Sequence, residues 1–179
     1  MKMLRPCLRA QTAALLRDHL LEFMYRVKPS EFCRPCDIMG GTAGQHARHI
    51  HDHFVRLVDV VECNDASLVQ YDIRARETKF ETDLITARAN VLDTMRRMEA
   101  IVEKSNLNSP IRVSFTIAGE EVEISSTVAR ECAFVVHHAF HHAASIKAIA
   151  TNLGFAPACP DGFGIAPSTA DYLAQNVRG

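Results

Sequence analysis

Eight of the nine histidines in this 179-residue chain lie in two short stretches. Residues 46–53 read HARHIHDH and residues 137–142 read HHAFHH, with four histidines in each. Neutral imidazole is a common ligand of transition-metal ions, and two imidazoles at positions i and i+4 of a helix can reach one ion. The two clusters therefore predict a metal ion that both stretches share.

His138 and His142 are the clearest ligand candidates of the second stretch. They lie about 40° apart on a helix, on the side that carries its apolar residues. Two buried imidazoles without partners would be costly, and a shared metal ion removes that cost. Glu131 lies on the same side two turns earlier, where it could act as a hydrogen-bond acceptor, a proton carrier and thus a catalytic residue, or a partner of Arg130.

The first stretch must supply the remaining ligand, and the helical pattern leaves a choice. His46 and His53 lie nearer the apolar stripe, His49 lies further round, and His51 falls on another face. His49 and His53 are themselves at i and i+4, so a four-histidine site is conceivable. Three histidines would leave Zn²⁺, Ni²⁺ or Fe²⁺ with open positions, as in catalytic sites, and imidazole alone does not select among these ions.

Readings without a metal ion also fit these residues. The interior histidines could hydrogen-bond to one another or to Glu131, which would make a pH-sensitive core. Metal uptake by the protein would separate the two readings.

The composition is that of an ordinary soluble domain, with 47% hydrophobic and 23% charged residues and a net charge of −1. A single domain over 1–179 is expected. The charge argues against nucleic acid as a partner, and no apolar run is long enough to span a membrane. The N-terminus lacks the continuous apolar stretch of a secretory signal, so we expect a cytoplasmic protein.

Four of the six cysteines stand alone, and only Cys33 and Cys36 form a C-x-x-C pair. A zinc ribbon would need a second pair, and a thioredoxin-like site would need a βαβ setting. We interpret the pair as two reduced thiols in a loop.

Apolar residues recur at helical spacing in four long segments, and Pro, Gly or polar residues separate them. Between the third and fourth segments, IRVSFTIAGEEVEIS alternates around a turn at AGE, which predicts a β-hairpin. We expect a mainly all-α fold, an up-down four-helix bundle. The expected helices are 8–27, 43–62, 81–104 and 127–152, with the hairpin at 111–125 and a Pro/Gly-rich tail over 154–179.

This pattern resembles the DinB/YfiT-like superfamily, whose four-helix bundles carry a histidine triad and a β-hairpin between helices 3 and 4. The resemblance covers most of the chain, through GQHARHIHDHF, YDIRARETKFETD, SSTVARECAFVVHHAFHH and DGFGIAPSTADYL. It implies that His49, His138 and His142 are the metal ligands. The helical pattern instead favours His53 or His46 on the first stretch, so His53 is kept as the rival of His49.

The resemblance also implies a function. Characterised relatives include thiol S-transferases, in which a divalent metal ion activates a low-molecular-weight thiol. A metal-dependent transferase or hydrolase acting on a small-molecule substrate is therefore expected, and a homodimer is expected at the family level. The alternative is a non-catalytic, stress-associated bundle in which the metal is structural.

Arg74 and Arg76 lie beside Asp72 and Glu77 in the connection before the third helix. A solvated charge run is our first interpretation of this segment. The alternative is a loop that caps the open end of the site and holds a substrate carboxylate.

Overall fold

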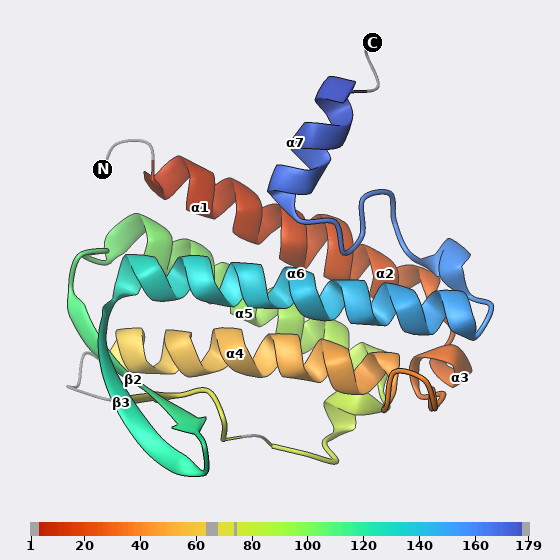
Figure 1. Ribbon diagram of the computed structural model, residues 1–179, viewed down its shortest axis with the longest axis horizontal. Coiled ribbons are helices and arrows are strands. Elements are labelled where there is room, and N and C mark those ends of the chain that lie inside the picture. Colours follow the sequence, from red (N-terminus) through yellow and green to blue (C-terminus); the bar gives the residue numbers. More distant parts are fainter. Residues whose placement is uncertain (1–3, 64–67, 74, 177–179) are drawn as a thin grey trace.

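The computed structural model describes residues 4–63, 68–73 and 75–176. The fold is mainly helical, which confirms the expected class, and it carries a small three-stranded sheet (Figure 1). The helices are α1 (Leu4–Ala13), η1 (Ala14–Leu21), α2 (Glu22–Arg26), α3 (Pro29–Phe32), α4 (Ala43–Cys63), η2 (Lys79–Glu81), α5 (Leu84–Lys104), α6 (Val128–Asn152), η3 (Ala156–Ala158) and α7 (Pro167–Asn176). The strands are β1 (Leu68–Gln70), β2 (Pro110–Ile117) and β3 (Glu120–Thr127).

The first helical segment starts at Leu4, four residues before the expected start at residue 8. It runs without a break through α1, η1 and α2, and η1 has the wider π-helical turn. Leu15, Leu16 and Leu20 of η1 are buried, so this turn faces the core.

The long helices pack on one another around one apolar core. Figure 1 shows α4 beside α6, with α5 behind them, and the α1–α2 segment along the far side of α6. Contacts between elements agree, because α4 touches both α5 and α6, and α1 and η1 touch both as well. Fully buried side chains from three of these helices meet in the core, among them Phe54, Leu57, Met98, Val135 and Ile146.

Local caps set where the main helices begin. Before α4, the Gln45 amide donates to the Thr42 hydroxyl and the Thr42 amide donates to the Gln45 side chain, both at 3.0 Å, which is a capping box. The Asp83 carboxylate accepts from the Ile85 amide, so α5 begins after it and not at residue 81 as expected. Thr127 caps α6 in the same way through the amide of Arg130.

The hairpin lies where it was expected, and the sheet has one strand more than the sequence predicted. β2 and β3 pair antiparallel, and Ala118 and Gly119 turn the chain between them with φ of 54° and 87°. β1 pairs with β2 in parallel, with Val69 opposite Val113. The sheet therefore ties the segment after α4 to the start of α6.

The tail after α6 packs back onto that helix before α7 begins. Gly164, with φ of 72°, lies so close that an added Cβ would be 2.6 Å from the Cα of Ala144.

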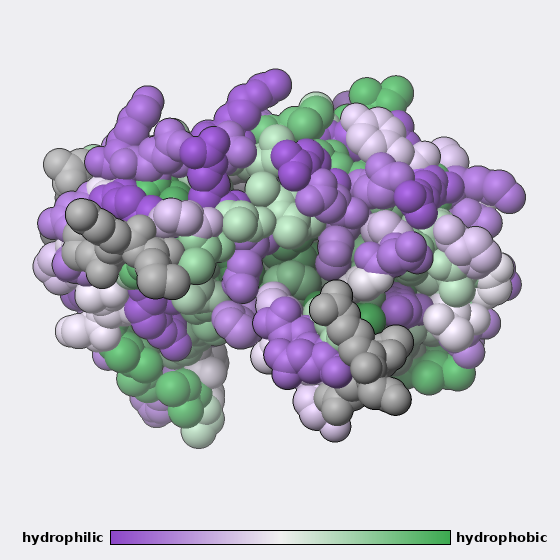
Figure 2. Space-filling model, turned by 90° about the horizontal axis from the view of Figure 1, so that it is seen from above, coloured by the Kyte–Doolittle hydropathy of each residue, from purple (hydrophilic) through white to green (hydrophobic). Residues whose placement is uncertain are grey.

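Figure 2, which looks down on the molecule, shows hydrophilic side chains over most of this face and a group of apolar side chains at its lower left. In the described part of the chain, no helix has the length and apolarity that a membrane crossing requires.

Candidate functional site

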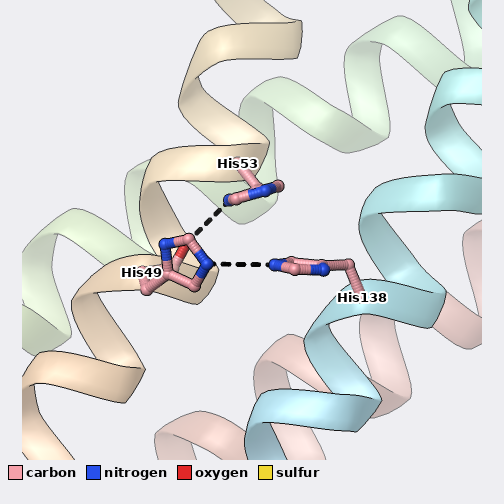
Figure 3. Close-up of side chains that lie close together, drawn as sticks. All are labelled: His49, His53 and His138. Carbon is pink, nitrogen blue, oxygen red and sulfur yellow. Dashed lines mark hydrogen bonds between the residues drawn. The ribbon is translucent and has the colours of Figure 1, made fainter. Parts of the chain in front are cut away.

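Two histidines of α4 and one of α6 converge in the core (Figure 3). His49 and His53 are each 6% exposed, and His138 is half-buried. Each offers a ring nitrogen, and these nitrogens all lie within 4.8 Å of one another. Three of the four ligands expected from the sequence therefore lie together.

The hydrogen bonds of the cluster orient its rings. His138 Nε2 lies 3.1 Å from His49 Nε2, and His53 Nδ1 lies 3.1 Å from the backbone oxygen of His49. A carbonyl can only accept, so His53 Nδ1 carries the proton and Nε2 of that ring keeps its lone pair. The rings of His53 and His138 stack with centroids 4.0 Å apart.

His142, the fourth expected ligand, is a neighbour of the cluster and is paired elsewhere. Its Nδ1 lies 3.0 Å from Nδ1 of His46. Its ring centroid still lies 4.3 Å from that of His49 and 4.6 Å from that of His138. The structure thus adds His46 to the site, as the helical pattern allowed, and joins five imidazoles.

Burial keeps the outer pair of imidazoles neutral near pH 7. It lowers the pKa of His142 to about 3, with a further contribution from the neighbouring His138. Burial also lowers the pKa of His46. Since neutral imidazole has a free lone pair, both rings keep a hydrogen-bond acceptor at neutral pH.

Glu131, the expected catalytic residue, is fully buried, and it hydrogen-bonds to residues outside the histidine cluster. Its carboxylate accepts from the Tyr71 hydroxyl at 2.9 Å and from Arg130 Nη1 at 2.6 Å, and Ser126 donates to it as well. The Tyr71 ring in turn stacks on His53, with centroids 5.0 Å apart and planes 9° apart. Glu131 therefore reaches the histidines through Tyr71, whose ring lies against that of His53.

A pocket of about 360 Å³ opens beside the cluster. Its lining includes His46, His49, His142, Arg48, Arg76 and Glu81. Arg48 is buried and paired twice, with Asp52 Oδ2 at 2.7 Å and with Glu81 Oε1 at 2.9 Å. Arg76 is exposed, and Arg74 lies outside the described residues.

His141 borders the cluster, with its ring centroid 5.1 Å from that of His142, whereas His51 and the C-x-x-C pair lie outside it. His51 packs on Phe80, and burial lowers its pKa to about 4. Cys33 and Cys36 are free thiols, as expected, and Cys36 contacts Asn152.

Comparisons with known proteins do not test the expected family. No family model matches the chain, and no solved structure matches it. The chain is similar to "FK506-binding protein 5" from Rhizopus delemar, with 29% identity over 142 residues, which are 78% of this chain and 35% of that protein. The chain thus spans about a third of the length of the curated relative that it matches.

This relative corrects the expected function. Its name refers to FK506 binding, whereas the sequence led us to expect a DinB-like thiol S-transferase, or a stress-associated metal bundle as the alternative. The expected transferase activity, with zinc or nickel, was wrong on this comparison. The three histidines are present, but they do not decide in favour of that activity. Membership of the DinB/YfiT-like superfamily stays a prediction, because a relative of this name does not bear on it.

Proposed function

We propose that His49, His53 and His138 hold one divalent transition-metal ion at the edge of the pocket. The observation that carries this proposal is the convergence of three ring nitrogens within 4.8 Å from two buried helix faces. An up-down arrangement of four helical segments is part of the proposal, because it presents α4 and α6 to the same interior point.

The donor set fits such an ion. Metal–imidazole bonds are about 2.1 Å long, so two ligands of one ion have nitrogens roughly 3.0–3.4 Å apart for bond angles between 90° and 109°. The 3.1 Å between His49 Nε2 and His138 Nε2 falls in this range. The carbonyl of His49 fixes the tautomer of His53, as acceptors do for metal-bound histidines.

The pocket would let a small molecule reach a bound ion. His49 belongs both to the cluster and to the pocket lining, so a ligand in the pocket could approach an ion that these histidines hold. When bound, the ion would supply a Lewis acid. The chain's own residues would hold the ion and position the ligand. The site thus favours binding of a small molecule beside the metal.

Metal content of the untagged protein tests this proposal. Elemental mass spectrometry after Co²⁺ loading and desalting should give close to one ion per chain. His49→Ala and His138→Ala should abolish this uptake. His137→Ala is the matched control, because His137 is exposed and adjacent to His138, and it should keep full uptake. Equal loss in the control and in the two cluster variants would contradict the site.

FK506 binding is a second candidate function, favoured by the name of the relative. A separate pocket of about 360 Å³ at the hairpin has an apolar wall made by Val113, Phe115 and Ile124, which suits a largely apolar ligand. Calorimetric titration with FK506 tests this function, and Phe115→Ala should weaken binding. Absence of heat at 100 μM protein would exclude it for this chain.

A further inference from the structure

Among the described residues that line the pocket beside the histidines, Arg76 has a guanidinium without a protein partner. Arg76 lines this pocket and has no hydrogen bond or ion pair with any described residue. Arg48, the other guanidinium of the lining, is held by Asp52 and Glu81. Arginine's planar fork matches a carboxylate through two parallel hydrogen bonds. Arg76 is therefore available to an anionic ligand, and Arg48 is not.

Charge in the pocket lining favours a ligand with two negative charges. Arg48 and Arg76 are balanced by the carboxylates of Glu77 and Glu81, so the lining is close to neutral by itself. A divalent ion on neutral imidazoles would add two positive charges. A ligand that bears two carboxylates would restore neutrality, with one group at the ion and the other at Arg76.

We infer that this pocket binds a small dicarboxylate that bridges the metal ion and Arg76. The inference rests on the metal site proposed above. The pocket volume of about 360 Å³ has room for a chain of a few carbons. One carboxylate would take the open side of the ion next to His49. Arg76, on the segment that follows β1, would hold the other.

The test uses the Co²⁺-loaded 179-residue protein and three anions: succinate, acetate and phosphate. Binding is measured by calorimetry and by the change in the visible Co²⁺ spectrum. Succinate should bind at least ten times more tightly than acetate, because acetate cannot bridge. Arg76→Gln should weaken succinate binding roughly 10- to 100-fold, as expected for loss of a charge-assisted pair. Arg96→Gln, which changes an exposed arginine on α5, is the matched control and should bind succinate like the wild type.

The outcomes separate this inference from the metal site itself. Co²⁺ uptake is measured first in every variant, and Arg76→Gln should keep it. Protein that takes up no Co²⁺ overturns the proposed metal site, and with it the dicarboxylate inference. Normal uptake with succinate bound equally well by wild type and Arg76→Gln, or no more tightly than acetate, overturns the inference alone. Phosphate bound more tightly than succinate would also overturn the carboxylate assignment.

Discussion

Replacing Gly44 by alanine tests how tightly α4 is pressed against η2. Gly44 is in the first turn of α4, and an added Cβ would lie 2.2 Å from the backbone oxygen of Glu81 and 2.9 Å from Cε1 of Phe32. Ordinary contact between these atoms needs about 3.3 Å, so one element must move by roughly 1 Å. Glu81 also binds Arg48, so the movement would strain that buried pair.

The magnitude follows from two opposed effects. Alanine is favoured over glycine inside a helix by about 1 kcal/mol. Overpacking costs about 1–3 kcal/mol and more when backbone must shift, and weakening a buried ion pair adds to that cost. We expect a net loss of about 2 kcal/mol, which lowers the midpoint of thermal unfolding by roughly 4–8 °C.

Urea unfolding followed by circular dichroism measures this loss. Arg96→Ala, on an exposed face of α5, serves as the comparison and should stay within about 0.5 kcal/mol of the wild type. A Gly44→Ala variant as stable as the wild type, or more stable, would show that the higher helix propensity of alanine outweighs any steric cost at η2, and would refute the close approach.

Three further predictions concern other parts of the fold. Tyr71→Phe removes a donor from buried Glu131 and should cost about 2 kcal/mol in urea unfolding, and an unchanged midpoint would contradict the bond. Iodoacetamide at pH 8 should label exposed Cys63 long before Cys132, because burial raises the pKa of the Cys132 thiol to about 12. Peptide mass spectrometry can follow the two labelling rates, and equal rates would refute the burial of Cys132. Burial lowers the pKa of His19 in the fold, so below pH 6.5 the unfolded chain binds more protons and stability falls; His19→Gln should flatten that fall between pH 7 and 5.

The elements that local sequence specifies were predicted almost to the residue. α4 and α6 have strong apolar periodicity and a capping threonine just before each, so their starts could be predicted from neighbouring residues alone. β1 was missed because it has only three residues and because its partner β2, which begins at Pro110, lies far from it along the chain. Such a pairing depends on the tertiary fold and leaves no periodic pattern in the sequence. The π-helical η1 was missed because side-chain spacing does not report the width of a helical turn.

The residues of the histidine site could be predicted from the sequence, but the contacts between their rings could not. Helical position placed His53 and His138 on the apolar side, because side-chain direction in a helix follows from position. The same pattern put His49 further round, and only the family resemblance pointed to it. The pairing of His46 with His142 depends on how α4 and α6 slide and rotate against each other. The role of Tyr71 depends on the turn after β1, which the sequence did not reveal. The expected transferase activity was wrong because one site geometry serves many chemistries.

Anomalous diffraction from crystals soaked in Co²⁺ tests the metal site most directly. The account predicts one strong peak per chain, bonded at about 2.1 Å to ring nitrogens of His49, His53 and His138. A fully soaked crystal with no peak at this position would contradict the metal site, and so would an ion that is coordinated by fewer than two of these three histidines.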